Sequence, residues 1–461
     1  MTSTPQQPAD ISIPELRAGL SGEVIGPDDS GYDEARTVFF RGIDRRPAAI
    51  ARVSDSADVS RVVSLARDSG AELAVRSGGH SRAGYGVTDG GIVLDLSAMQ
   101  AVDVDADGRI AWAETGLTAG RYTTATGEHG LTTGLGDTGS VGIGGITLGG
   151  GVGFLVRKNG LTIDDLLGAE MVTADGQIRQ VDAETEPDLF WGIRGGGGNF
   201  GVATRFKLRL HQISEIVGGM LILPATAEVI AGFLQAAGAA PEELSTIANV
   251  MIAPPLPFVP EEAHGKPVVM ALFAYSGPVD QGERVIAPFR ALAEPLADMV
   301  RPMRYPELYE GPEPEVHFGV GSNFFADSLD PAGAETILEE LPKSTAPMKA
   351  VQLRVLGGAM GRLPNDATAF AHRDRGLFVN VAAMYMDVAE TETHEAWVGG
   401  VVDALGRDGA GGYVGFLGEE DEATIRAAYP GATWDRLREV KRRYDPDNLF
   451  HLNHNIPPAG A

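Results

Sequence analysis

The sequence predicts a mixed fold of strands and helices, of the α+β class, divided into two domains. At 461 residues the chain is too long to bury a single ordinary hydrophobic core. Short apolar segments bounded by turn residues recur in its first half, and one of them contains an Asp-Gly pair typical of an antiparallel hairpin. Beyond about residue 212 the segments become longer, and helical stretches alternate with prolines.

The first 115 residues predict strands joined by one helix. We expect a strand over 49–53 and a helix over 54–70, because serine and aspartate stand at its start and glycine at its end. Further strands are expected over 73–76, 92–96, 101–105 and 110–115. Segment 169–181 alternates apolar residues around Asp175 and Gly176, which predicts an antiparallel hairpin.

Glycine-rich and helical segments dominate the remaining chain. Two glycine-rich stretches, 134–153 and 194–201, predict loops around a bulky group. Helices are expected over 227–237 and 332–341, in the second domain. The tail, 423–458, predicts a closing helix that ends at an Asp-Pro-Asp turn, because proline stops a helix.

Charge and composition exclude several classes of function. With 63 acidic against 37 basic residues, the formal net charge of −26 repels nucleic acid and anionic lipid, so neither is an expected partner. The absence of cysteine removes disulfides, thiolate metal sites and cysteine nucleophiles. The nine histidines show no metal-ligand spacing, so no metal site is predicted. The N-terminus shows no export signal, and a cytoplasmic protein is expected.

One short turn suggests an anion site. Residues 75–81, Val-Arg-Ser-Gly-Gly-His-Ser, bring a histidine directly behind two glycines at the end of a strand. Without Cβ atoms, backbone N–H groups can approach an anion such as a pyrophosphate, although these residues also suit a plain turn. The glycines from 142 to 153 lack the Lys-Ser/Thr of a P-loop, and no Rossmann motif stands between a strand and a helix. A Rossmann dinucleotide site is therefore disfavoured.

Four motifs, in this order, resemble a known family. They are VRSGGHS at 75–81, VGIGGITLGGGVG at 141–153, DLFWGIRGGGGNFGVAT at 188–204 and YDPDNLFHLNHNIPP at 444–458. The chain resembles, over nearly its whole length, the berberine-bridge-enzyme-like branch of the vanillyl-alcohol-oxidase superfamily. The resemblance implies a PCMH-type FAD-binding domain over 1–212, completed by the C-terminal segment 413–461. Residues 213–412 would then form a substrate-binding domain of antiparallel sheet backed by helices.

The resemblance also gives the histidine a role. In this family the histidine at the position of His80 is bonded to the 8α-methyl of the flavin, so we expect FAD to be attached covalently through His80. Many relatives have a second bond from a cysteine, and this chain has Thr138 there. A single attachment is therefore expected. Thr138 either hydrogen-bonds near flavin N5 or only packs beside the ring.

Further FAD contacts are implied by the same motifs. The expected contacts are Arg76, Ser77, Gly78, Gly79, His80, Ser81, Thr138, Gly142, Gly145, Val202, Asn453 and Asn455. The two asparagines match family positions near the flavin pyrimidine or the pyrophosphate, although both also suit a C-terminal turn. The tail histidines, His451 and His454, are interpreted as surface or contact residues.

The sequence leaves the proton acceptor open. Relatives often place a tyrosine on a strand ahead of the tail, where this chain has Phe416. Tyr413 is three residues earlier, so on a strand it would face the opposite way. Gln352 and Arg354 share one face of a strand that the resemblance places over the flavin, and both are candidate catalytic residues. An unpaired Arg354 would favour anionic oxygen, and the alternative is a surface or interdomain ion pair. Two further candidates are Tyr385 and His372.

Val141 bears on the choice of oxidant. In relatives this position lies over flavin C4a, where valine leaves room for oxygen and leucine fills it, although Val141 also suits plain packing. Together these features predict an FAD-dependent oxidase that passes electrons from a small secondary-metabolite alcohol, amine or phenol to O2, as a monomer or homodimer. The alternatives are a flavin-dependent oxygenase acting on a polyketide-like substrate, and a flavin-binding protein without turnover, suggested by Phe416.

Overall fold

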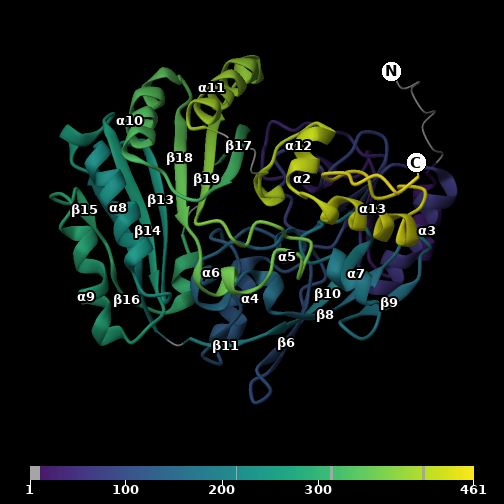
Figure 1. The fold of residues 1–461 in the computed structure, drawn as a ribbon. Helices are drawn as coiled ribbons and strands as arrows, with labels where there is room; N and C mark the ends of the chain where they lie inside the picture. The colour runs from purple at the N-terminus through teal and green to yellow at the C-terminus, as the bar shows by residue number, and fades with distance from the viewer. Residues whose placement is uncertain (1–10, 214, 312–314, 407–410, 461) are drawn as a thin grey trace.

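The computed structural model describes residues 11–213, 215–311, 315–406 and 411–460. The chain forms two bodies of secondary structure that lie side by side (Figure 1). One body holds three sheets from the first half of the chain together with the C-terminal helices, and the other holds one large sheet with its own helices. In the part of the chain described, no helix combines the length and the apolar character needed to cross a bilayer.

A four-stranded sheet carries the histidine turn. Its strands lie in the order β1 (Glu23–Ile25), β2 (Ala49–Arg52), β4 (Ile92–Asp95) and β3 (Leu73–Arg76), and the last three are parallel. Helix α3 (Ser56–Ser69) buries its valines against this sheet. Asp55 caps the helix by accepting a hydrogen bond from the N–H of Asp58, and Gly70 ends it with a φ of 68°. The predicted strands and helix are confirmed to within two residues.

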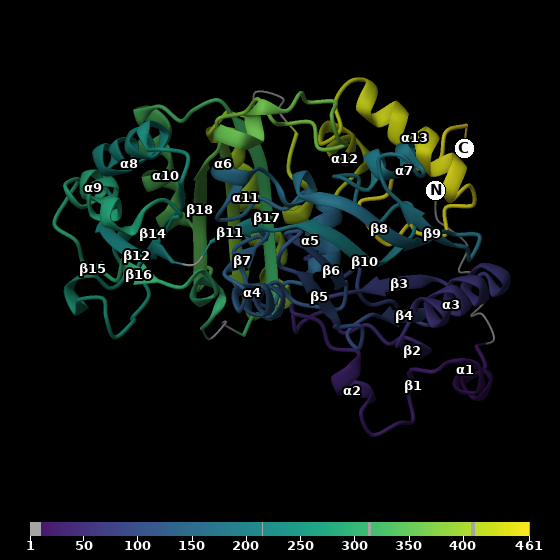
Figure 2. The same ribbon diagram turned by 90° about the horizontal axis from the view of Figure 1, so that it is seen from below.

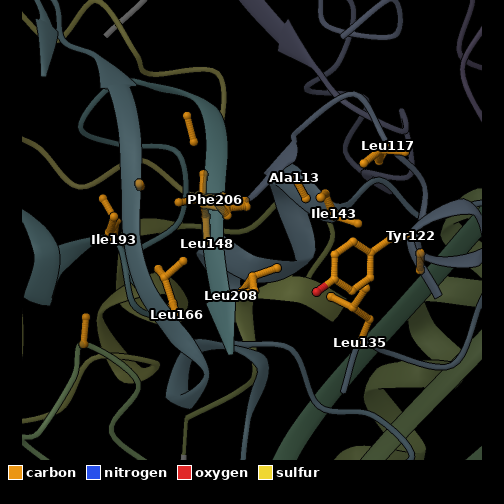
Figure 3. Packing of buried hydrophobic residues seen from close by; sticks show 14 of the residues in the cluster. Ala113, Leu117, Tyr122, Leu135, Ile143, Leu148, Leu166, Ile193, Phe206 and Leu208 are labelled. Carbon is orange, nitrogen blue, oxygen red and sulfur yellow. The ribbon is translucent and has the colours of Figure 1, made fainter. Parts of the chain in front are cut away.

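A five-stranded antiparallel sheet packs beside it. The order is β5 (Val102–Asp105), β6 (Ile110–Glu114), β10 (Val202–Arg209), β8 (Leu166–Val172) and β9 (Ile178–Val181). The hairpin predicted over 169–181 is confirmed by the antiparallel pairing of β8 with β9, and Gly176 takes a φ of 78° in its turn. Phe206 and Leu208 of β10 pack with Ile143 and Leu148 in the core behind this sheet (Figure 3).

Short elements connect these sheets. They are α1 (Ile13–Gly19), α2 (Tyr32–Ala35), α4 (Ala119–Gly127), β7 (Leu131–Thr132), α5 (Ile143–Gly149), α6 (Val156–Asn159), α7 (Pro187–Gly192) and β11 (His211–Gln212). The prediction of a loop throughout 134–153 is wrong in part, because α5 occupies its middle. Ile143 and Leu148 are buried there, and a helix satisfies the backbone polar groups that a buried loop would leave unpaired. The stretch 194–201 has neither helix nor strand, as predicted.

The second body is built on an eight-stranded antiparallel sheet. Its strands are β12 (Ile216–Pro224), β13 (Leu244–Ile252), β14 (Pro267–Tyr275), β15 (Ala297–Asp298), β16 (Arg301–Met303), β17 (Phe318–Ala326), β18 (Met348–Val355) and β19 (Leu377–Tyr385). The order is β15-β12-β14-β13-β18-β19-β17, with β16 also on β12. The helices α8 (Ala227–Ala239), α9 (Val279–Arg290), α10 (Pro331–Glu340) and α11 (Thr391–Ala404) pack against one face (Figures 1 and 2). The predicted helices 227–237 and 332–341 are confirmed.

The other face of this sheet meets the first body. Phe325 of β17 and Phe378 of β19 pack against Val152 and Val156 from the first body, near the start of α6. Side chains that point away from the four helices are therefore the ones that reach the glycine-rich segments.

The C-terminal tail returns to the first body. Helices α12 (Glu422–Ala427) and α13 (Ala432–Tyr444) follow the large sheet, and α13 lies against α7 (Figure 1). Trp434, Leu437 and Val440 of α13 join the core of the first body. The closing helix and its stop at the Asp-Pro-Asp turn are as predicted.

The strand expected around Tyr413 and Phe416 is absent from the described structure. Val414–Phe416 forms one turn of 3₁₀ helix instead. The side chain of Asn323 accepts a hydrogen bond from the N–H of Tyr413 at 2.6 Å and donates one to its carbonyl at 3.3 Å. A side chain therefore satisfies the backbone groups that a neighbouring strand would otherwise pair.

Candidate active site

The histidine turn, residues 75–81, lies in direct contact with the glycine motif 141–153. A Cβ added at Gly78 would overlap the backbone of Gly142, and a Cβ at Gly142 would overlap Gly78. The hydroxyl of Ser77 donates to the carbonyl of Thr115 at 2.5 Å and accepts from the N–H of Gly144 at 3.3 Å. Only glycine fits at the two contact points, so the two motifs form one backbone-lined cradle.

A cavity of about 550 Å³ opens beside this cradle. Arg76, Ser77, Gly78, Gly79 and His80 supply one part of its wall. Ser140, directly before the glycine motif 141–153, and residues of β1, β2 and the segment between them supply further parts. Asp95 and Ser97 complete the wall. The structure thus gathers most of the residues predicted from VRSGGHS around one space.

Two neighbours fix the imidazole of His80. Its Nε2 lies 2.7 Å from the hydroxyl of Ser140, within hydrogen-bond distance. Phe39 stacks on the ring with centroids 4.1 Å apart and planes inclined by 23°, and its N–H donates to the carbonyl of Gly79 at 3.1 Å. Sequence reasoning missed both residues. Ser140 could have been found from its place inside the glycine-rich stretch 134–153. Phe39 gave no signal, because it is distant from His80 in the chain.

Arg76 is held at the cavity wall by one edge of its guanidinium. Nη2 donates to Asp95 at 3.0 Å and to the carbonyl of Ala35 at 2.7 Å. Burial would raise the pKa of Asp95, but the charge and hydrogen bond of Arg76 outweigh it and the pKa is lowered overall. Nη1 of Arg76 is buried and has no hydrogen-bond partner among the described residues.

The C-terminal tail also leaves buried polar atoms unpaired. Oδ1 of Asn453, Oδ1 of Asn455 and Nδ1 of His454 lack hydrogen-bond partners within the described ranges. The ring of His454 lies edge-on to Tyr85 at 5.4 Å, and burial lowers its pKa to about 4, so it is neutral at pH 7. His451 is exposed, 3.6 Å from Glu72. Unpaired buried polar atoms are uncommon in folded proteins, and with Oδ1 of Asn448 the motif 444–458 contains four of those found among the described residues.

Three predicted FAD contacts lie in different surroundings. Val202 begins β10 and is 1% exposed, so its side chain belongs to the core and only its backbone could reach a ligand. Gly145 is exposed on α5, with open space where a Cβ would stand. Ser81 is half-buried, and its carbonyl accepts from the N–H of Gly84 at 3.1 Å.

Arg354 joins the two bodies of the molecule. Its Nη2 pairs with Asp137 at 2.6 Å, Nη1 donates to the carbonyl of Val152 at 2.9 Å, and Nε donates to Gln352 at 2.8 Å. Arg354 is 3% exposed. Of the two alternatives for this residue, the unpaired cation is therefore wrong and the ion pair between the two parts of the chain is found.

Thr138 and Val141 follow directly after this ion pair. The hydroxyl of Thr138 donates to Asp137 at 3.2 Å. Val141 is half-buried, and its carbonyl accepts from the N–H of Ala119 at 2.8 Å. The segment 137–141 is thus tied to the large sheet through the ion pair of Asp137 with Arg354.

The rings of Tyr413 and Phe416 are neighbours, not on opposite faces as a strand would place them. Their centroids are 5.7 Å apart, and the guanidinium carbon of Arg354 lies 5.1 Å from the centre of the Phe416 ring. The Tyr413 hydroxyl accepts from the N–H of Gly151 at 2.9 Å. Burial raises its pKa to about 12, although that hydrogen bond and Arg354 oppose the shift.

The last two candidate catalytic residues, His372 and Tyr385, hydrogen-bond to other parts of the chain. His372 is buried, its Nε2 lies 3.1 Å from the carbonyl of Ala428, and burial lowers its pKa to about 4. The Tyr385 hydroxyl donates to Thr391 at 2.8 Å at the start of α11. Neither residue lines the cavity at His80.

A row of amide side chains crosses the large sheet. Asn249, Gln352, Asn380 and Asn323 stand directly opposite one another on β13, β18, β19 and β17. Nε2 of Gln352 donates to Asn249 at 3.0 Å. We call these four residues the amide row; its members lie on the face turned to the first body. Its only sequence signal is one amide in each of four strands, and their register is not visible in the chain.

Comparisons with known proteins decide the family. The profile described as "FAD binding domain" matches residues 47–182, and the one described as "Berberine and berberine like" matches 413–457. (R)-6-hydroxynicotine oxidase from Paenarthrobacter nicotinovorans is 33% identical over 456 residues, covering 96% of this chain and 98% of that protein. The chain belongs to the berberine-bridge-enzyme-like family of FAD-linked oxidoreductases. It is an FAD-dependent oxidoreductase, as the resemblance implied.

Solved structures of this family share the fold throughout. The crystal structure of 6-hydroxy-D-nicotine oxidase from Arthrobacter nicotinovorans matches with a TM-score of 0.83 at 30% identity, covering 95% of this chain and 98% of that one. Glucooligosaccharide oxidase from Acremonium strictum matches with a TM-score of 0.83 at 23% identity, covering 97% and 100%. The α+β, PCMH-type fold with an antiparallel sheet backed by helices is confirmed.

Arg354 gives the first testable prediction for this oxidoreductase. Replacing Arg354 with methionine is expected to lower the free energy of unfolding by about 2–4 kcal/mol, since it leaves a largely buried carboxylate unpaired. Arg362→Met is the matched control, because that arginine is 60% exposed in its pair with Glu242 and should contribute less than about 1 kcal/mol. Denaturant unfolding would measure both, and equal losses would contradict the assigned role.

Proposed function

We propose that the protein is an oxidase that takes a hydride from a small organic substrate, a secondary-metabolite alcohol, amine or phenol, and returns the electrons to O2. The observation that carries the proposal is the position of His80, at a cavity wall beside the cradle of Gly78 and Gly142 and oriented by Ser140 and Phe39. The relatives that oxidise hydroxynicotine and glucooligosaccharides support it, because they match nearly the whole chain.

The residues around the cavity fit FAD. The cradle is lined by glycine backbone, which suits the close approach of a pyrophosphate, and the unpaired Nη1 of Arg76 offers a donor. The unpaired amide oxygens of Asn453 and Asn455 suit the N–H groups of a flavin or an adenine. We assign FAD contacts to Arg76, Ser77, Gly78, Gly79, His80, Ser81, Thr138, Gly142, Gly145, Asn453, Asn455 and the backbone of Val202. Residues 1–212 and 413–461 would bind FAD, and 213–412 the substrate.

Covalent attachment through His80 alone is part of the proposal. Glucooligosaccharide oxidase carries a 6-S-cysteinyl, 8α-N1-histidyl FAD. This chain has no cysteine, and the hydroxyl of Thr138 is directed to Asp137. A histidyl bond therefore remains as the single link.

The chemistry divides between FAD and the chain. Bound FAD supplies the two-electron acceptor for hydride transfer. Gln352 is half-buried on the sheet face turned to the first body. Its Oε1 accepts from Arg354 and one N–H donates to Asn249, so the second N–H of its amide is the group that would hydrogen-bond substrate. Arg354 acts as a positioning residue, because Asp137, Val152 and Gln352 already take its donors.

Neither Phe416 nor Tyr413 is suited to accept a proton from the substrate. Phe416 has no titratable group, and Tyr413 stays protonated near neutral pH because burial raises its pKa to about 12. An amine that binds in its unprotonated form needs no protein base when it loses a hydride. This favours an amine among the proposed substrates.

Anaerobic titration tests the function directly. The purified holoprotein would be mixed with a panel of alcohols, cyclic amines and phenols while the flavin absorbance is followed. An oxidase is expected to lose its flavin colour with one class, to recover it in air, and to give product without label under labelled O2. Labelled product would identify an oxygenase. A flavin that no panel member bleaches and that air does not reoxidise would identify a binding protein.

Val141 provides a prediction for the oxygen step. Val141→Leu is expected to slow air reoxidation of the reduced protein about tenfold or more, without loss of FAD, because one added methylene would fill the space that oxygen needs. Stopped-flow mixing of the anaerobically reduced proteins with O2 would measure the rates. Equal rates would remove Val141 from the mechanism, and a slow wild type would make the protein a dehydrogenase. The factor of ten corresponds to a barrier change of about 1.4 kcal/mol.

A further inference from the structure

Arg82 lies where the two bodies of the molecule meet, two residues after His80. Its Nη1 donates to the carbonyl of Phe416 at 3.2 Å, and its guanidinium carbon lies 5.9 Å from the centre of the Phe416 ring. A Cβ added at Gly321 of β17 would overlap Nη1. The guanidinium therefore occupies the space that any side chain at position 321 would fill.

This position puts Arg82 on the same sheet face as the amide row. Positions 321 and 323 are two residues apart on one strand, so both point to the same face, and Asn323 is a member of the row. Asn380, its neighbour on β19, is 4% exposed, and its Oδ1 has no hydrogen-bond partner in the described part of the chain. Such an atom is costly in a folded protein unless a ligand or water satisfies it.

Arg82 differs from Arg354 and Arg76 in having no carboxylate partner among the described residues. Arg354 pairs with Asp137, and Arg76 pairs with Asp95. Arg82 makes no ion pair with any described carboxylate, although the formal net charge of the chain is −26. Its neighbours Phe416 and Gly321 of β17 carry no charge, so they do not compensate the charge of Arg82.

The surroundings of Arg82 make an anion favourable. Burial lowers its pKa to about 10, because removal from water disfavours the charged form, yet the side chain remains charged at pH 7. A partly desolvated cation is stabilised when an anion pairs with it, and a guanidinium can hold a carboxylate by two parallel hydrogen bonds.

We propose that Arg82 binds an anionic group of the substrate, a carboxylate or phenolate, while the unpaired Oδ1 of Asn380 in the amide row accepts a hydrogen bond from the same molecule. The inference rests on the proposed function, because it assigns a specificity residue to the site of that reaction. It predicts that the substrate carries a negative charge at a distance from the atom that loses hydride.

Calorimetric titration of the holoprotein tests this. The probes are benzoate and nicotinate, each compared with its uncharged amide. Wild type is expected to bind the carboxylates about tenfold or more tightly than the amides, the usual size of a charge-assisted hydrogen bond. Arg82→Met should abolish the preference, and Arg82→Lys should keep part of it. Arg375→Met is the control, since that arginine pairs with Asp327 at the edge of the same sheet.

Several outcomes would overturn the inference. Wild type that binds acids and amides equally, or binds neither, excludes an anion site at Arg82. A preference that survives in Arg82→Met, with wild-type unfolding temperature and flavin content, places the site elsewhere. Arg82→Gln serves as a second variant if the methionine variant does not fold. Because binding is measured without turnover, a protein that prefers carboxylates yet is never reduced would disprove the oxidase and leave the anion site intact.

Discussion

Alanine in place of His80 is expected to release all FAD into the supernatant when the protein is precipitated with acid, whereas the wild type keeps its yellow colour in the pellet. Precipitation destroys the non-covalent contacts of the cradle, so only a covalent bond retains flavin. The chain has no cysteine to form a second one. Flavin absorbance in pellet and supernatant would give the ratio directly.

Two controls sharpen that experiment. His451→Ala removes an exposed histidine of the tail and should leave the pellet yellow. Ser140→Ala removes the hydroxyl beside Nε2 of His80 and should slow attachment without preventing FAD binding. A yellow pellet from His80→Ala would show that another residue holds the flavin, and a colourless wild-type pellet would show that none does.

Replacing Asp445 with asparagine is expected to lower the free energy of unfolding by about 3–5 kcal/mol, because it leaves a buried charge unpaired. Lys441 and Asp445 are both 0% exposed and lie 2.6 Å apart. Nζ of Lys441 also donates to the carbonyls of Asn199 and Phe450, while Asp445 accepts from the N–H groups of Leu449 and Phe450. The pair therefore fastens the tail to the glycine-rich segment 194–201.

The stability of the wild type should depend on pH, and the binding of FAD should depend on the same buried pair. Burial lowers the pKa of Lys441, so the unfolded chain binds more protons than the folded one, and stability should rise with pH between the folded value and the ordinary value of 10.5. FAD should dissociate more readily before covalent attachment, because Asn453 and Asn455 lie in the tail. Glu439→Gln on the same helix is the control, since its pair with Arg442 is exposed and should contribute less than about 1 kcal/mol. Equal unfolding curves for the two variants would contradict the role of the buried pair.

The local elements were accessible from the sequence because their signals are local. Helix α3 shows its capping aspartate and its terminal glycine, and the β8–β9 hairpin shows its Asp-Gly turn. The histidine turn was visible for the same reason, since two adjacent glycines and a histidine form one short motif. The 3₁₀ turn at Tyr413 was not, because the partner that replaces a strand is Asn323, far away in the chain.

What the sequence by itself determined was the family, the α+β class, the lack of any cysteine link and the residues of the histidine turn. Only the tertiary structure decided which distant groups meet. It brought Gly78 against Gly142, paired Arg354 with Asp137, placed Phe39 on His80, and set Arg82 over Gly321 beside the amide row. The reason is physical: a motif records the conformation of its own backbone, whereas the partner of a charge or an aromatic ring depends on strand register and on how two separately built bodies pack.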